Sequence, residues 1–156
     1  RGDLYQGALT LLTPLAETPV GAIARVEALW AAVGSRVRRM DPIAHDHAVV
    51  AASHLPHVLA STAAAQLDAA ALPLAATGFR DTTRVAGGSP DLWSEILIAN
   101  RDAVRAGMAA AQAHLAALDA ALACGDVAAV RAWLEHGHAG RQRFELAGAR
   151  TTRDGQ

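Results

Sequence analysis

Residues 89–125 read SPDLWSEILIANRDAVRAGMAAAQAHLAALDAALACG. Side chains suited to packing recur here every three or four residues, the spacing that places them on one side of a helix. They are Trp93, Ile96, Leu97, Asn100, Val104, Met108, Ala111, Leu115, Leu118 and Leu122. The spacing predicts one helix of about eight turns, which begins after a Ser89 N-cap and ends at Gly125. Such a long stripe needs a partner helix, either the following segment or the same helix of a second copy.

Further helices are predicted on both sides of this stretch. Asp41-Pro42 is a cap followed by proline, the usual start of a helix, and this helix continues towards Leu59 with Pro56 as a kink or break. After Gly125, a second amphipathic helix is predicted from Val127 to about Leu146. We expect no strand after Asp41, and we expect the polar tail 151–156 to be disordered.

The first 40 residues have a different pattern. The run from Ala8 to Thr13 is typical of a short strand, and Arg36 to Met40 of a second one. Between them, a helix is predicted to begin at a Thr18 N-cap and to end at Gly34. A lone strand–helix–strand unit cannot bury both faces of its strands, so we expect it to belong to a larger sheet.

The composition narrows the possible classes of function. Apolar residues make up 52% of the chain and aromatic residues only 4%, so alanine supplies much of the apolar content. Alanine loses no side-chain entropy in a helix, so this bias favours a mainly α-helical fold. The 14 basic side chains nearly balance the 15 acidic ones. We therefore expect no nucleic-acid partner and no attraction to an anionic membrane.

The sequence contains no pattern typical of a signal peptide, and polar residues interrupt its most apolar region, Ala48 to Leu74. Cys124 is the only cysteine, so no intramolecular disulfide can form, which fits a reducing compartment. We therefore expect a soluble, cytoplasmic protein without a membrane-spanning helix.

Two segments contain the side chains best suited to chemistry. The first has His45-Asp46-His47 followed by Ser53-His54-Leu55-Pro56-His57, with His54 and His57 on one face of a helix. These histidines could bind a metal ion, line a ligand pocket, or lie on the surface without a role. No cysteine cluster or HExxH pattern accompanies them to favour zinc.

The second segment is Gly78-Phe79-Arg80-Asp81-Thr82-Thr83-Arg84, which we expect to lie in a loop between two helices. Arg80 and Arg84 present planar forks that match a carboxylate, with Asp81 as an internal counter-ion. The alternative is a solvated loop whose charges pair with one another.

In order and spacing, these motifs resemble those of the prephenate and arogenate dehydrogenase family. Each motif is weak alone, but the ordered set is specific, and the resemblance extends from about Leu11 to about Leu122. The matching motifs are His45-Asp46, Ser53 to His57, Gly78 to Arg84, Pro90-Asp91-Leu92-Trp93 and Asn100.

The resemblance implies an oxidoreductase of tyrosine biosynthesis that uses NAD or NADP. Prephenate would be oxidatively decarboxylated to 4-hydroxyphenylpyruvate, or arogenate to tyrosine. A hydride leaves the ring carbon that bears the hydroxyl group, and carbon dioxide departs as the ring becomes aromatic. The helical domain of this family supplies part of the substrate pocket and nearly all of the dimer interface, so a homodimer is expected.

The resemblance also implies which residues bind the substrate. Arg84 corresponds to the position that holds a substrate carboxylate, and His57 lies in the pocket. Asp81 borders the pocket through polar contacts and Trp93 borders it by packing. Gly78 begins the matching stretch, but Ala76-Thr77 precede it where some relatives have further glycines, so a gating role for this backbone does not carry over.

In this family the catalytic histidine and the GxGxxG turn belong to a nucleotide-binding domain, and neither occurs in this sequence. No catalytic, cofactor-binding or metal-binding residue is therefore assigned to the chain, which we expect to be inactive alone. Residues 1–40 are interpreted as the end of the nucleotide-binding sheet and 41–150 as the helical dimerisation and substrate-binding domain. Two alternatives stay open: a stand-alone helical module that binds an aromatic acid, and a metal-binding bundle built on His45 to His57.

Overall fold

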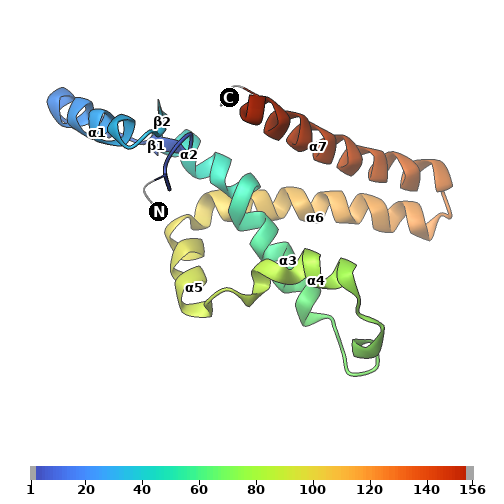
Figure 1. Cartoon of the computed structure of the whole chain (residues 1–156). Coiled ribbons are helices and arrows are strands. Elements are labelled where there is room, and N and C mark those ends of the chain that lie inside the picture. Colours follow the sequence, from blue (N-terminus) through green and yellow to red (C-terminus); the bar gives the residue numbers. More distant parts are fainter. Residues whose placement is uncertain (1–2, 154–156) are drawn as a thin grey trace.

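The computed structural model describes residues 3–153 and is mainly helical, with two short strands near its N-terminal end (Figure 1). The elements follow in the order β1 (Leu9–Leu12), α1 (Val20–Ala32), β2 (Arg36–Arg39), α2 (Pro42–Val49), the π-helical turn η1 (Val50–His54), α3 (Leu55–Ala65), the 3₁₀ turn η2 (Leu72–Leu74), α4 (Thr77–Thr83), the 3₁₀ turn η3 (Arg84–Gly87), α5 (Pro90–Ala99), α6 (Arg101–Ala123) and α7 (Val127–Arg153).

The N-terminal unit is the predicted strand–helix–strand. Strands β1 and β2 pair in parallel, with Leu9 opposite Arg36, and Gly34 ends the α1 region with a φ of +87°. The predicted Thr18 cap is wrong: Pro19 is the N-cap, and the Thr18 hydroxyl instead accepts a hydrogen bond from the Leu15 backbone N–H at 3.0 Å. A bidentate ion pair joins Glu27 of α1 to Arg39 of β2 at 2.5 and 2.6 Å. The hydrogen bond from Arg39 lowers the pKa of Glu27 and raises the pKa of Arg39 itself.

A continuous helical rod formed by α2, η1 and α3 crosses the middle of the molecule (Figure 1). Asp41 caps its start, as predicted, by accepting a hydrogen bond from the Ala44 N–H at 2.9 Å. The predicted break at Pro56 is wrong, because the π-helical turn comes just before this proline and the rod continues through it. The wider turn accommodates the proline ring and its missing N–H.

By length and composition alone, the 24-residue stretch Pro42–Ala65 could cross a membrane, so the prediction that polar residues leave no run long and apolar enough to span one is wrong. Central helices of water-soluble proteins meet the same criterion, and two of its histidines, His54 and His57, are buried in the fold.

The predicted loop at residues 78–84 is also wrong, since most of this segment forms the short helix α4. Phe79 and Thr83 are its half-buried residues, one turn apart, and α4 packs against α3. The Thr83 hydroxyl also donates a hydrogen bond to the Phe79 carbonyl at 2.7 Å. Packing of this face therefore favours a helix in a segment whose polar residues are typical of a loop.

The predicted eight-turn helix is two helices, because the chain bends at Asn100 between α5 and α6 (Figure 1). Asn100 has φ −110° and ψ 29°, outside helical geometry, and its side chain bonds to residues of the central rod. Both predicted ends are confirmed: the Ser89 hydroxyl caps α5 by accepting from the Leu92 N–H at 3.4 Å, and Gly125 turns with a φ of +65°.

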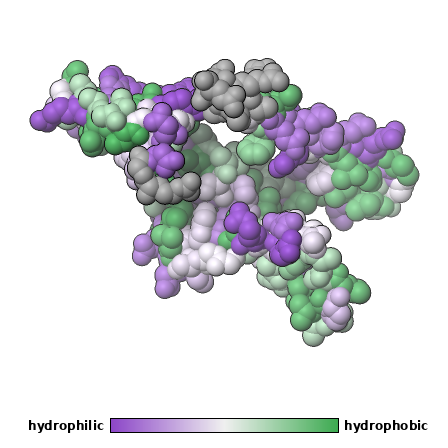
Figure 2. All heavy atoms as spheres, in the orientation of Figure 1, coloured by the Kyte–Doolittle hydropathy of each residue, from purple (hydrophilic) through white to green (hydrophobic). Residues whose placement is uncertain are grey.

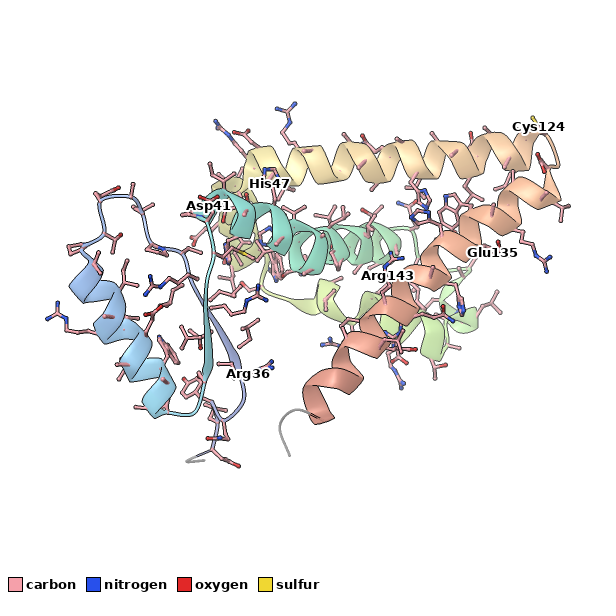
Figure 3. All side chains as sticks on the ribbon, turned by 90° about the horizontal axis from the view of Figure 1, so that it is seen from above. Arg36, Asp41, His47, Cys124, Glu135 and Arg143 are labelled. Atoms are coloured by element: carbon pink, nitrogen blue, oxygen red, sulfur yellow. The ribbon has the colours of Figure 1, made fainter. Side chains whose placement is uncertain are left out.

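Helices α6 and α7 form a hairpin that opens away from its turn, where Cys124 lies (Figure 3). The Trp133 indole of α7 stacks on His114 of α6 and donates a hydrogen bond to the His114 carbonyl at 2.8 Å. Helix α7 extends to Arg153, beyond the predicted end near Leu146. The first three residues of the predicted disordered tail are therefore helical, and residues 154–156 lie outside the described residues.

The single chain has a very small core. Within the described residues, the buried apolar side chains are Val50, Ala60, Val104 and Ala121. The accessible surface is 11,813 Å² for a mass of 16.1 kDa, whereas a compact monomer of this mass exposes about 7,400 Å². Figure 2 shows apolar side chains exposed near the turn between α6 and α7 and on the projecting segment that contains η2. Much of this surface is therefore suited to contact with further protein.

Candidate functional site

The central rod meets the start of α5 at a stacked pair of rings. His57 of α3 lies flat against Trp93 of α5, with ring centroids 3.5 Å apart and planes inclined by 15°. His57 is 6% exposed. Ser89 and Pro90 start α5 so that Trp93 is reached after one turn, and His57 follows the π-helical turn. The structure thus brings together two of the five predicted site residues.

Gly88 closes one side of this pair. A Cβ atom at Gly88 would lie 2.7 Å from Trp93 Nε1 and 3.3 Å from His57 Cε1. The indole ring is rigid and held by His57, so it cannot yield to a methyl group without leaving the stack. Gly88 was not among the site residues predicted from the sequence, because its contact with Trp93 becomes visible only in three dimensions.

We expect Gly88→Ala to separate Trp93 from His57 and to lower the free energy of unfolding by about 1–3 kcal/mol, the usual cost of overpacking. Gly87→Ala is the matched control, because a Cβ there meets no atom within 4 Å. Denaturant unfolding of both variants checks this expectation. Equal stability of the two variants would contradict the close packing at Gly88.

A cavity of about 430 Å³ opens beside the ring pair and is lined by His57, Val58, Ser61, Thr62, Ala86, Gly88, Pro90, Trp93, Ser94 and Leu97. The Thr62 and Ser94 hydroxyl groups donate to backbone carbonyls, so their lone pairs are free to accept. Within residues 3–153, Nδ1 of His57 is buried and has no hydrogen-bond partner. A buried ring nitrogen of this kind is normally satisfied by water or a ligand, so His57, which lines the cavity, has one unmet hydrogen-bonding position.

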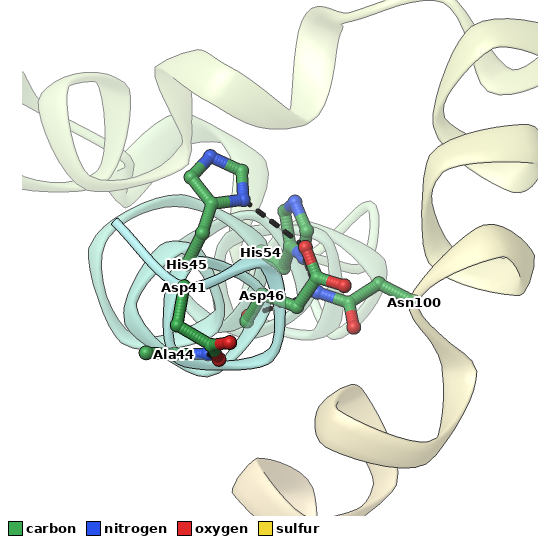
Figure 4. Close-up of polar contacts among 6 residues, drawn as sticks. All are labelled: Asp41, Ala44, His45, Asp46, His54 and Asn100. Carbon is green, nitrogen blue, oxygen red and sulfur yellow. Dashed lines mark hydrogen bonds and ion pairs between the residues drawn. The ribbon is translucent and has the colours of Figure 1, made fainter. Parts of the chain in front are cut away.

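A polar cluster of Asp46, His54 and Asn100 reaches the ring pair through the contact of His54 with Trp93, and Figure 4 shows its polar contacts. The side-chain nitrogen of Asn100 donates to the Asp46 carbonyl at 3.0 Å and lies 3.4 Å from Nδ1 of His54. His54 is 9% exposed and meets Trp93 edge-on, with ring centroids 6.3 Å apart. Nδ1 of His45 contacts the Asp46 carboxylate at 3.0 Å (Figure 4).

The other three predicted site residues, Gly78, Asp81 and Arg84, lie on α4 and the first residue of η3, and all are exposed. The described residues that line the His57–Trp93 cavity include none of them. Asp81 forms an ion pair with Arg80 at 3.1 Å. Within residues 3–153, no side chain pairs with the Arg84 guanidinium, so this cation is available to a ligand.

The structure does not gather the histidines into a metal site. Among the described residues, no group of three His, Cys, Asp or Glu side chains is placed to hold a metal ion. His45 contacts Asp46, His54 contacts Asn100 and His57 stacks on Trp93. These separate environments favour the pocket interpretation over the metal-binding bundle.

Comparison with known proteins gives a consistent result. Residues 41–136 match the family model "Prephenate dehydrogenase, dimerization domain". The chain is 37% identical over 109 residues to a cyclohexadienyl dehydrogenase of Zymomonas mobilis, a match that covers 65% of this chain and 37% of that protein. It is 34% identical over 107 residues to a prephenate dehydrogenase of Bacillus subtilis, a match that covers 65% of this chain and 29% of that protein.

Solved structures of similar proteins cover more of the chain. The structure of Synechocystis arogenate dehydrogenase matches 91% of this chain and 54% of its own, with 27% identity and a TM-score of 0.79. A prephenate dehydrogenase from A. aeolicus in complex with hydroxyphenyl propionate and NAD+ matches 91% of this chain and 52% of its own, with 26% identity and a TM-score of 0.79. The chain therefore spans about half of these solved chains and about a third of the curated relatives.

Proposed function

Because the chain belongs to the prephenate dehydrogenase family, whose dimerisation domain it contains, we propose that it supplies part of the substrate pocket of an NAD- or NADP-dependent dehydrogenase. The reaction is the oxidative decarboxylation of prephenate to 4-hydroxyphenylpyruvate. The observation that carries this proposal is the buried His57–Trp93 pair beside a cavity, with the Nδ1 atom of His57 unpaired within residues 3–153. The similar A. aeolicus enzyme was solved with an aromatic propionate and NAD+, which supports the same ligand class here.

The residues of this chain bind and orient the substrate in this proposal. The Trp93 face packs against the cyclohexadienyl ring, and the His57 ring presents a nitrogen to one of its polar groups. Arg84 holds a carboxylate with its planar fork. Asp81 holds Arg80, which leaves Arg84 as the free cation of this segment, and Gly78 leaves the start of α4 without a side chain. Apolar walls exclude water from the ring as it becomes aromatic.

The nicotinamide cofactor accepts the hydride in this reaction. The described residues do not form a glycine-rich nucleotide turn, and β1–α1–β2 is only a two-stranded sheet. We therefore assign no cofactor-binding or catalytic residue to this chain, and we propose that a nucleotide-binding domain extends the sheet of β1 and β2. We further propose a cytoplasmic homodimer.

Arogenate is the second candidate substrate, because the arogenate dehydrogenase of Synechocystis has the same fold over 91% of this chain. It differs from prephenate in carrying an amino group where prephenate carries a keto group. The contacts proposed for Trp93 and Arg84 involve the ring and a carboxylate, which prephenate and arogenate share, so both substrates fit these two contacts.

A fusion protein tests this function. Residues 1–156 would replace the matching C-terminal region of the Zymomonas mobilis relative, and the fusion would be assayed with prephenate and arogenate, each with NAD and NADP. We expect cofactor reduction by the fusion and none above background by the isolated chain, because hydride transfer needs a bound nicotinamide. The unmodified relative is the control for a competent nucleotide-binding domain.

The outcomes separate the hypotheses. Turnover by the isolated chain would overturn the assignment of cofactor binding to another domain. An inactive but folded fusion, together with binding of hydroxyphenyl propionate by the isolated chain, would favour a stand-alone module that binds aromatic acids.

A further inference from the structure

We propose that Asn100 is a positioning residue, which sets the ring orientation of His57 through His54 and Trp93. Asn100 touches neither His57 nor the cavity beside it. Its influence passes through three successive contacts, each with a distance or an angle in the structure. Only the consequence for substrate binding rests on the proposed function, and the ring orientation can be tested without substrate.

The first contact fixes the amide of Asn100. The Asp46 carbonyl can only accept a hydrogen bond, so the nitrogen of the Asn100 amide must face it, at 3.0 Å. This nitrogen has a second hydrogen, and Nδ1 of His54 lies 3.4 Å away. Both amide hydrogens are therefore directed at the central rod, one to the backbone and one to the His54 ring (Figure 4).

The second contact fixes the tautomer of His54. An amide nitrogen only donates, so Nδ1 of His54 must accept and must lack a proton. The ring proton of neutral His54 is then on Nε2. A proton on Nδ1 would oppose the Asn100 N–H and would push the two side chains apart. Because His54 is 9% exposed, its ring has little room to rotate away.

The third contact links the fixed His54 ring to Trp93 and, through Trp93, to His57. The His54 ring meets Trp93 edge-on at 86°, and Trp93 in turn stacks on His57 at 3.5 Å. No hydrogen bond within residues 3–153 orients His57 Nδ1, so its ring depends on Trp93 and Gly88 for its position. Asn100 also forms the bend between α5, which carries Trp93, and α6. A substitution of Asn100 should therefore change the ring orientation of His57.

Nuclear magnetic resonance of the full chain with ¹⁵N- and ¹³C-labelled histidine tests the proposal near pH 8, where free histidine is neutral. We expect His54 to show an unprotonated Nδ1 and a protonated Nε2. We expect the His57 ring protons to be shifted upfield by the Trp93 indole. Replacement of each histidine by glutamine assigns the signals.

Two substitutions then separate positioning from general stability. Asn100→Ala removes both donors, and the His57 signals should move towards those of free histidine. Asn100→Asp keeps the size but presents only acceptors, so His54 should acquire a proton on Nδ1. Arg101→Ala is the matched control at the same bend, because its exposed side chain pairs with exposed Asp102 and, in the part of the chain that the structure describes, with no other side chain; it should leave both histidines unchanged.

In the fusion with the relative, Asn100→Ala should lower kcat/KM about 10-fold or more, since small displacements of positioning groups have effects of this order. Two results would overturn the proposal. One is a proton on Nδ1 of His54 in the unaltered chain, which needs no variant to fold. The other is an unchanged His57 signal in a folded Asn100→Ala chain.

Discussion

The chain is expected to form a homodimer at micromolar concentration, and Leu134→Glu is expected to convert it to a monomer. Val127, Val130 and Leu134 follow one another at three- and four-residue steps along α7 and line an open groove. Val127 is 80% exposed and Leu134 is 58% exposed in the single chain. Trp133, the neighbour of Leu134, faces α6 instead. The Leu134 face of α7 is thus free to meet a second copy.

The size of the uncovered surface indicates how strong this association should be. The single chain exposes about 4,400 Å² more than a compact monomer of the same mass. Obligate dimers bury about 2,000–5,000 Å² in total, roughly half from each partner. The excess of one chain is therefore enough for a large dimer interface and for a further contact of the β1–α1–β2 unit with the rest of a sheet.

Leu134→Glu would place two unpaired carboxylates in such an interface, one from each copy. Each should cost about 3 kcal/mol, so the dissociation constant should rise by roughly four orders of magnitude. Light scattering and concentration-dependent unfolding measure this change. Val20→Glu is the control, because Val20 is 78% exposed but lies on α1, away from the α6–α7 hairpin. A monomeric unaltered chain at micromolar concentration would contradict the prediction.

The sequence predicted correctly those features that depend on interactions between residues close together in the chain. Asp41, Ser89 and Gly125 mark helix ends because each acts on residues within one turn. The parallel pair of strands was predicted from two short segments separated by one helix, and only the first of them, β1, is mainly apolar. These features need no knowledge of distant contacts.

The bend at Asn100 could not be predicted in this way. Asn100 lies on the same helical stripe as Trp93 and Val104, so the periodicity continues through it without interruption. The bend depends on Asp46 and His54, which are 54 and 46 residues away in the sequence. The helix α4 is a similar case, since its packing against α3 outweighs the polar composition of its residues.

In the candidate site, too, contacts between residues distant in the sequence could not be predicted from local signals. The sequence placed His57 and Trp93 in one pocket only through the order of its motifs, and the structure brings their rings to 3.5 Å. Gly88 has no side chain, so no pattern in the sequence predicts its close approach to Trp93. Close approach of backbone to a ring is the physical reason for glycine at this position.

We expect Arg84→Ala in the fusion to raise the KM for prephenate by roughly 30- to 1,000-fold, which corresponds to about 2–4 kcal/mol. Prephenate is a dicarboxylate, and a partly dry pocket needs cations to hold it. The sequence contains no lysine, so the permanent side-chain cations of this chain are all arginines. In the motif-bearing segment the choice is between Arg80, which forms an ion pair with Asp81 at 3.1 Å, and Arg84, whose guanidinium forms no ion pair with a side chain of the described residues.

The kinetic pattern follows from what the carboxylate does during the reaction. The carboxylate proposed to bind Arg84 stays charged in both the bound substrate and the transition state, so its loss should weaken both about equally. Most of the effect should then appear in KM, with kcat changed little. Arg84→Lys should restore binding only in part, because an ammonium group keeps the charge but cannot form the two parallel bonds of the guanidinium fork.

Arg80→Ala is the matched control, because Arg80 lies on the same short segment and is also exposed to solvent. We expect it to raise KM by a few-fold at most, because its ion pair with Asp81 is exposed and such pairs contribute little. Steady-state assays of both variants with prephenate measure the difference, and thermal unfolding confirms that both remain folded. A larger KM for Arg80→Ala than for Arg84→Ala would contradict the prediction. The carboxylate contact would then be assigned to Arg80.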